Sequence, residues 1–282
     1  MKLCRYGEPR TEKPGLIGRY GRLRDLSGIR ADIGLNEISP EGLTALAAID
    51  SAALPLVAGT PRFGVPYTGL FKFICIGLNY SDHAAEAGMA VPSEPIIFLK
   101  APSAVSGPND PIVQPPHSTK LDWEVELGVE IGSTARFVDE ADGLDYVAGY
   151  CAVNDVSERA FQLQSSQWDK GKGCDTFGPL GPFLVTADDV HDRQTPDMRL
   201  DVNGQRMQTG NTRPMIFGVR EIVAYYCRRY MTLLPGDIIA TGTPPRVGMG
   251  MKPDPVWLKP GDLVELEIVG LGRQSQRVVR GG

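Results

Sequence analysis

Three acidic residues carry the side chains best suited to bind a divalent cation. Glu124 and Glu126 lie in DWEVELGVEIG (122–132), where apolar and polar residues alternate as they do in a β-strand. Alternate side chains point to opposite faces, so the two glutamates share a face about 7 Å apart. Asp155, which closes the apolar run YVAGYCAV, is a candidate third ligand. Oxygen ligands alone select a hard ion such as Mg²⁺, Mn²⁺ or Ca²⁺ over zinc.

Both assignments have an alternative. A strand whose polar face meets water would present the same glutamates, and Asp155 suits the N-cap of a helix expected from SERAFQLQ (157–164). By residue type alone, the cap is the commoner role for this aspartate. Two details favour a cation: the polar positions of the strand hold no lysine or arginine, and Gly128 and Gly132 clear room beside the carboxylates.

A histidine and a glutamate form the second candidate group. His83 and Glu86 lie in a helical stretch, SDHAAEAG (81–88), that follows the strand-like segment FICIGL. Residues three apart share a helix face, so the carboxylate can orient the imidazole and leave its other nitrogen free as a base. The alternative is a surface pair at a helix start. His117 and His191 lie in polar loops, and we expect no catalytic role for them.

Two loops that contain glycine are candidates for contacting an anionic substrate. QSSQWDKGKGCDTFGP (164–179) presents Lys170 and Lys172, and a flexible loop of this kind can act as a mobile lid. TGTPPRVGMG (241–250) offers hydroxyls and backbone N–H groups, which suit a carboxylate cradle. A solvated linker and an ordinary turn are the respective alternatives.

Strands must position most of these residues. Turn-forming Pro-Gly-Asp occurs at 235–237 and 260–262, each time before a strand-like run, and GVREIVAYYCRRYMTL (218–233) predicts a helix. No regular alternation of strands and helices appears, which favours a mostly β fold with some α (α+β), a roll or sandwich of largely antiparallel strands. Besides 122–132, strands are expected at FICIGL (73–78), PIIFLK (95–100), DYVAGYCAVND (145–155), DIIATG (237–242) and DLVELEIVG (262–270).

The N-terminal quarter has a different pattern. We expect residues 1–70 to form a small α+β domain and residues 71–282 to form the catalytic domain. Within the first, 19–34 predicts short strands joined by turns, and proline begins a short helix over 40–50. The segment 53–69, rich in proline and glycine, has the composition of a linker.

Composition excludes several classes of protein. The chain has 282 residues, 42% hydrophobic and 22% charged, with a formal charge of −5. This is a globular balance, and it offers no basic surface for nucleic acid. Five scattered cysteines without a C-x-x-C motif favour a reduced, cytoplasmic protein over a disulfide framework or zinc cluster. The apolar runs are too short to span a membrane.

Taken in order, these motifs resemble the fumarylacetoacetate hydrolase family over roughly residues 70 to 270. The N-terminal MKLCRYG and RDLSG are similar to a subgroup of 2,4-diketo-3-deoxy sugar acid hydrolases, also described as ureidoglycolate lyases. The matching stretches include IGLNYSDHAAE, PIIFLK, DWEVELGVEIG, GYCAVNDVSERAFQ, KGKGCDTFGPLGP, LLPGDIIATGTP and LKPGDLVELEIVGLG.

The resemblance implies roles for individual residues. Relatives read TGTPxGVG, whereas this chain has Arg246 at the glycine, which can narrow or recharge the pocket. The implied site consists of the metal ligands Glu124, Glu126 and Asp155, the catalytic residues His83, Glu86 and Lys172, and the substrate-binding residues Arg159, Gln162, Thr243 and Lys100.

The resemblance also implies a mixed β-sandwich roll with a small N-terminal domain, a homodimer, and a Mg²⁺ or Mn²⁺ cofactor. We hypothesise hydrolysis of a carbon–carbon bond in a small 2,4-dioxo acid, either an acylpyruvate or a 2,4-diketo-3-deoxy sugar acid, to pyruvate and a hydroxy acid. One alternative is a lyase or decarboxylase on the same metal site, such as oxaloacetate decarboxylase or ureidoglycolate lyase. A metal-stabilised binding protein without turnover is the third.

Overall fold

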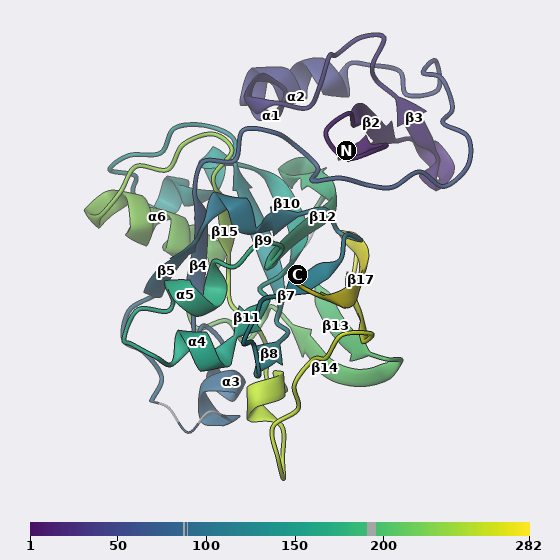
Figure 1. Ribbon diagram of the computed structural model, residues 1–282. Coiled ribbons are helices and arrows are strands. Elements are labelled where there is room, and N and C mark those ends of the chain that lie inside the picture. Colours follow the sequence, from purple (N-terminus) through teal and green to yellow (C-terminus); the bar gives the residue numbers. More distant parts are fainter. Residues whose placement is uncertain (87, 89, 191–195) are drawn as a thin grey trace.

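The computed structural model describes residues 1–86, 88, 90–190 and 196–282, so His191 lies outside the described residues. Within them, strands dominate and form sheets of ten, five and two strands (Figure 1). Most neighbouring strands are antiparallel, and three pairs among the described residues are parallel: β4 (Phe73–Gly77) with β15 (Ile238–Ala240), β6 (Val105–Ser106) with β12 (Gly178–Thr186), and β7 (Ile112–Gln114) with β17 (Gly272–Arg280). The prediction of a mostly β, mixed roll with a few helices is confirmed.

The largest sheet has the spatial order β3-β2-β1-β12-β10-β9-β15-β4-β5, with β6 paired to β12 beside this path. Its strands are β1 (Lys2–Tyr6), β2 (Lys13–Ile17), β3 (Leu23–Asp25), β4 (Phe73–Gly77), β5 (Ile96–Lys100), β6 (Val105–Ser106), β9 (Val125–Ile131), β10 (Val147–Asn154), β12 (Gly178–Thr186) and β15 (Ile238–Ala240).

The smaller sheets and the helices complete the chain. The five-stranded sheet has the order β14 (Gln205–Asn211), β13 (Asp197–Val202), β16 (Leu263–Ile268), β17 (Gly272–Arg280) and β7 (Ile112–Gln114). The short pair is β8 (Leu121–Asp122) and β11 (Ser157–Glu158). The α-helices are α1 (Leu35–Ile38), α2 (Pro40–Ala47), α3 (Ser81–Glu86), α4 (Arg159–Gln162), α5 (Asp169–Lys172) and α6 (Val219–Arg229).

The predicted turns form as expected. Gly236 and Gly261 have φ of 84° and 99°, the left-handed conformation that the third position of a type II turn requires. In each turn the aspartate N–H donates to the carbonyl three residues earlier, at 3.0 Å. Strands β15 and β16 follow directly, so both Pro-Gly-Asp predictions are confirmed.

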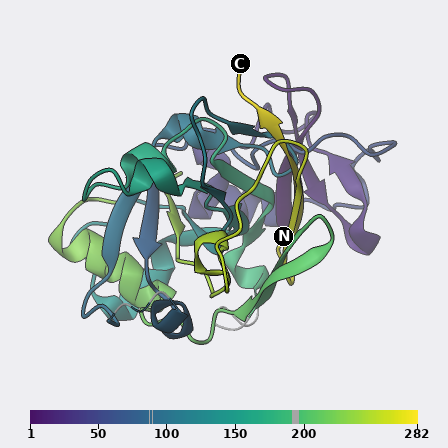
Figure 2. The ribbon, with the colours of Figure 1, turned by 60° about the horizontal axis from the view of Figure 1, so that its bottom comes forward.

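The N-terminal residues extend the largest sheet. Strand β1 pairs antiparallel with β12, so β1, β2 and β3 continue the sheet that carries β9 and β10. Figures 1 and 2 agree that these purple strands lie at the opposite end of the molecule from α3. The helix expected after residue 40 is present as α2, with the Ser39 side chain accepting the Gly42 N–H at its start. The division at residue 70 stays a prediction.

Both faces of β9 are buried. The apolar residues predicted to share a face all lie in one core cluster, which α6 also covers: Trp123, Val125, Leu127, Val129 and Ile131. On the other face the glutamates are buried too, so the alternative of a strand with one face in water is wrong. The prediction that Gly128 clears room is also wrong, because a Cβ there would lie 2.7 Å from Val153 Cγ2.

Glu130 is buried on this face without a cation. Its side chain is fully buried, and among the described residues its carboxyl group pairs with no cation and has the Cys151 thiol as its neighbour. Burial raises the pKa of Glu130 to about 8, from an ordinary value of 4.5. Folding therefore takes up a proton at this residue between about pH 5 and pH 8.

We predict that Glu130→Gln changes how stability depends on pH. A carboxyl whose pKa is raised by folding contributes less stability as the pH rises, by up to about 1.4 kcal/mol per unit between about pH 5 and 8. Glu130→Gln removes the titrating carboxyl group. As the pH rises over this range, the free energy of unfolding of the variant should therefore increase by a few kcal/mol relative to that of the wild type. Urea unfolding at several pH values checks it, with the exposed Glu8→Gln as control. Parallel profiles for wild type and Glu130→Gln would contradict the prediction.

Two further observations concern the cysteines and the helices. All five cysteines are free thiols, as predicted. Among the described residues, none of the helices has the length and apolar character that a membrane crossing requires.

Candidate metal centre and catalytic pocket

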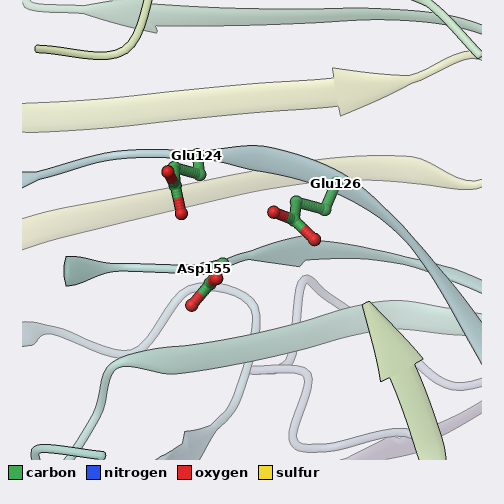
Figure 3. Close-up of side chains that lie close together, drawn as sticks. All are labelled: Glu124, Glu126 and Asp155. Atoms are coloured by element: carbon green, nitrogen blue, oxygen red, sulfur yellow. The ribbon is translucent and has the colours of Figure 1, made fainter. Parts of the chain in front are cut away.

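Glu124, Glu126 and Asp155 converge, as the sequence predicted. One carboxylate oxygen from each lies within 4.8 Å of the others, and all three side chains are buried. Figure 3 shows the carboxyl groups pointing toward one another, with the glutamates on one strand segment and Asp155 on its neighbour. The all-oxygen donor set suits Mg²⁺, Mn²⁺ or Ca²⁺.

The pairing of β9 with β10 produces this convergence. Asn154, the last residue of β10, pairs with Val125 at the start of β9. One residue further, the Asp155 N–H donates to the Glu124 carbonyl at 2.9 Å. The Asn154 side chain accepts the Glu124 N–H at 3.2 Å. Asp155 is thus placed opposite Glu124 by backbone contacts, and the helix-cap alternative is wrong because Glu158 caps α4.

Two lysines contact Asp155 from different sides. Lys172 Nζ donates to Asp155 Oδ2 at 2.6 Å and also to Glu124 Oε2, so its ammonium bridges the two carboxylates. Lys100 Nζ donates to Asp155 Oδ1 and, at 3.0 Å, to the Val156 carbonyl. Lys100 was expected on the pocket side; it lies behind Asp155, away from the cavity wall.

Arg159 connects the triad to a carboxylate that we did not identify from the sequence. Its guanidinium donates to Glu124 Oε1 at 2.6 Å and to Asp122 Oδ2 at 2.8 Å. It also donates to Gln162 Oε1 at 2.9 Å, so the two residues of α4 that the resemblance implied as substrate-binding contact each other. Burial opposes ionisation of Glu124, but Arg159 and Lys172 hold its pKa below the ordinary value.

Glu126 has no such cation among the residues that the structure describes. Its Oε2 accepts the Gly242 N–H at 2.8 Å. Burial, together with the charges of Asp155 and Glu124, raises the pKa of Glu126 above its ordinary value. A cation among the three carboxylates would remove this repulsion, so the residues present fit a divalent metal.

His83 and Glu86 also come together, on α3. His83 Nδ1 lies 3.5 Å from Glu86 Oε2, and the imidazole is buried. The backbone N–H of Arg246 donates to the same Glu86 oxygen at 2.7 Å, which fixes the carboxylate beside the ring. His117 is exposed, as expected.

The loop at 241–250 binds carboxylates of the protein itself. Its N–H groups hold Glu126 from Gly242, Glu86 from Arg246 and Asp122 from Gly248. The expected cradle is therefore present, but in this structure it orients site residues. Three separate parts of the site are positioned by one loop.

The Arg246 side chain leaves the pocket. Its Nε donates to the Met207 carbonyl at 2.8 Å, along β14, and its backbone takes a φ of 73°, a region that favours glycine. The expectation that this arginine narrows or recharges the pocket is wrong, because it does not line the cavity.

The site residues surround one cavity of about 280 Å³. Its polar lining consists of eight of the predicted site residues: Glu124, Glu126, Asp155, His83, Arg159, Lys172, Gln162 and Thr243. The Thr243 hydroxyl donates to the Val125 carbonyl at 3.0 Å and accepts from Gln208 at 2.9 Å. The rest of the lining is apolar and was not predicted. The full lining is Ile76, Gly77, Leu78, His83, Phe98, Glu124, Glu126, Asp155, Arg159, Gln162, Leu163, Trp168, Lys172, Thr243 and Met249.

The segment 164–179 was expected to be a flexible lid, and its movement stays a prediction. It contains helix α5, which packs against α4 so closely that a Cβ on Gly171 would lie 2.5 Å from Gln162 Cβ. Lys172 is buried in the site, whereas Lys170 is exposed. In the sequence, the glycines of this segment indicated flexibility; in the structure, Gly171 permits the close packing of α5 against α4.

Comparison with known proteins agrees with this geometry. A family model described as fumarylacetoacetate (FAA) hydrolase C-terminal matches residues 72–279. A protein of Burkholderia ambifaria whose name describes it as a hydrolase is 59% identical over 277 residues, 98% of each chain. A similar protein of Burkholderia cenocepacia is 58% identical over the same share.

Solved structures of the same overall shape include hydrolases and isomerases. Fumarylacetoacetate hydrolase from Exiguobacterium antarcticum is 34% identical, with a TM-score of 0.87 over 100% of both chains. A probable 2-hydroxyhepta-2,4-diene-1,7-dioate isomerase from Mycobacterium abscessus is 30% identical, with 0.85 over 100% of both. Maleylpyruvate hydrolase from Sphingobium, in complex with manganese(II) and pyruvate, is 30% identical, with 0.83 over 100% of both.

Proposed function

The chain belongs to the fumarylacetoacetate hydrolase family, and from that membership and its pocket we propose that it is a divalent-metal-dependent hydrolase. Its substrate is a 2,4-dioxo acid, in which water cleaves the C3–C4 bond to give pyruvate and a second acid. One observation carries the proposal. Three converging carboxylates share a cavity of about 280 Å³ with a histidine that faces a glutamate.

The charges of the site support an anionic substrate. In the network around the triad, Lys100, Lys172 and Arg159 pair with Asp155, Glu124 and Asp122, and among the described residues no cation pairs with the fourth carboxylate, Glu126, so a fully ionised network keeps one negative charge. A divalent cation held by Glu124, Glu126 and Asp155 would reverse that sign and act as a Lewis acid on the substrate's 2-oxo group. The related maleylpyruvate hydrolase holds manganese and pyruvate, which supports both the ion and this product.

His83 is the proposed general base. Glu86 faces its Nδ1, so the other ring nitrogen is free to take a proton from water while the oxygen attacks C4. The C3–C4 bond then breaks, C4 becomes the carboxyl carbon of the released acid, and C3 takes a proton to complete pyruvate. Catalysis requires one water molecule and no other co-reactant.

The basic residues are proposed to bind and orient the substrate. Lys172 and Arg159 line the cavity and present buried positive charge to the oxygens of the dioxo acid. Gln162 is fixed by Arg159, and Thr243 forms part of the wall next to β9. Lys100 acts through Asp155, whose carboxylate it contacts from behind.

One observation favours a lyase or decarboxylase as the second candidate. The separation of 3.5 Å between His83 Nδ1 and Glu86 Oε2 exceeds an ordinary hydrogen bond. Cleavage of oxaloacetate to pyruvate and carbon dioxide, or of ureidoglycolate, would use the metal site without an activated water. We keep hydrolysis first because His83 lines the same cavity as the triad.

The proposed function is tested by a spectrophotometric screen. Acylpyruvates, 2,4-diketo-3-deoxy sugar acids, oxaloacetate and ureidoglycolate are each incubated with the protein and Mg²⁺ or Mn²⁺. We expect metal-dependent loss of the dioxo-acid absorbance together with formation of pyruvate. Turnover of oxaloacetate or ureidoglycolate alone would favour the second candidate. A Mg²⁺-induced thermal shift without turnover of any compound would favour a binding protein.

The homodimer implied by the family resemblance and the cytoplasmic location indicated by the cysteines remain proposals. Light scattering coupled to size-exclusion chromatography tests the dimer.

A further inference from the structure

The cavity has a wall that the catalytic proposal does not use. Beside the polar residues, its lining is apolar and comes from β4, β5, the segment around α4 and α5, and Met249, with the Lys172 Nζ atom 5.0 Å from the centroid of the Phe98 ring. Three members of this wall, Trp168, Leu163 and Met249, were not assigned a role. Apolar surface that faces a ligand cavity favours an apolar part of the ligand.

Trp168 is held rigidly. A Cβ on Gly77 would lie 2.7 Å from its Cζ3 atom, so the indole ring lies directly on the backbone of β4. The ring of Phe98 meets it edge to face, with centroids 5.2 Å apart. A preformed aromatic surface binds an apolar group at little cost in conformational entropy.

Two apolar side chains at the same cavity are left in water. Leu163 is 63% exposed and Met249 is 37% exposed, and both line the cavity. Leu163 ends α4, and Met249 lies in the 3-10 helix Gly248–Gly250, so they come from separate parts of the chain. A ligand that passes between them would remove apolar surface from water at both.

We propose that the substrate carries an apolar acyl group, an alkyl chain or aromatic ring, and that Trp168, Leu163 and Met249 determine this specificity. The inference rests on the proposed function for the reaction, because it assigns the group attached to C4. A polyhydroxylated chain would lose hydrogen bonds to water against this wall without replacement from it. Sugar-derived dioxo acids are therefore the poorer substrates.

A series of acylpyruvates tests the inference. With Mn²⁺ present, kcat/KM should rise about fourfold for each methylene that becomes buried, from acetylpyruvate through butanoylpyruvate to hexanoylpyruvate. A 2,4-diketo-3-deoxy sugar acid of equal length should be at least about tenfold poorer than the matched acylpyruvate. A flat series, or preference for the sugar acid, would overturn the inference while leaving the hydrolase proposal standing.

Variants assign the effect to this wall. Leu163→Ser, at an exposed position that should not disturb folding, is expected to lower the hexanoyl-to-acetyl ratio of kcat/KM by about threefold. Trp168→Ala should lower it further, whereas Val269→Ser, an exposed apolar residue outside the cavity, should keep the wild-type ratio. An unchanged ratio in both Leu163→Ser and Trp168→Ala would overturn the assignment.

Calorimetric binding of the same compounds separates this inference from the proposed function. If the compounds bind with an affinity that rises with acyl length but are not hydrolysed, the hydrolase proposal is refuted and the apolar site is supported. Affinity that is independent of acyl length would refute the apolar site, whether or not the compounds are hydrolysed.

Discussion

Glu126→Gln is expected to abolish both Mn²⁺ binding and hydrolysis. Glu126 is the carboxylate of the triad that pairs with no cation among the described residues, and burial, together with the charges of Asp155 and Glu124, raises its pKa. Glutamine keeps the shape and can still accept the Gly242 N–H, but it removes the negative charge that a divalent ion needs. Because the bound ion would lower the activation barrier by several kcal/mol, its loss should reduce kcat/KM by about a thousandfold or more.

Isothermal titration with Mn²⁺ and a hydrolysis assay check this prediction together. Glu130→Gln is a matched control, because Glu130 lies on the same strand and the same buried face but outside the triad. It should bind Mn²⁺ as wild type does. Wild-type Mn²⁺ affinity in Glu126→Gln, or full turnover of the wild-type enzyme in EDTA, would contradict the role of the triad.

His83→Ala is expected to lose hydrolysis by about a hundredfold to ten-thousandfold while keeping its metal. The imidazole faces Glu86 and lines the cavity, but it is not part of the carboxylate triad. Removing it eliminates the proposed base for water and leaves the ligands in place. Mn²⁺ affinity should therefore equal that of the wild type.

A comparison of two reactions makes this prediction specific. If the His83→Ala variant has lost hydrolysis but still decarboxylates oxaloacetate, the dyad serves to activate water. His117→Ala, at an exposed position, is the control and should retain both activities. Normal hydrolysis by His83→Ala would refute the assignment of the base and favour the lyase alternative.

The alternation of side chains in 122–132 predicted part of the candidate metal site. It placed Glu124 and Glu126 on one face, and the end of the next apolar run supplied Asp155. The alternation could not distinguish a face in water from a buried one. That difference depends on Lys172 and Arg159, which compensate the charge from 48 and 35 positions away in the chain.

Other features depend on contacts between distant segments. Asp122 lies two residues before Glu124 on the same side of the strand, a signal that could have identified it. Its role became evident only from the N–H of Gly248 and the guanidinium of Arg159, both brought to it by the fold. The pairing of β1 with β12 is a backbone contact, and Pro179 and Pro182 obscured β12 as a strand.

Anomalous diffraction at the manganese edge, from crystals soaked in Mn²⁺, tests the central claim most directly. The account predicts one strong peak between the carboxylate oxygens of Glu124, Glu126 and Asp155, within the 2.0–2.6 Å or so that hard divalent cations keep from oxygen. No peak there at saturating Mn²⁺, with the Lys172 ammonium still bridging Glu124 and Asp155, would contradict it.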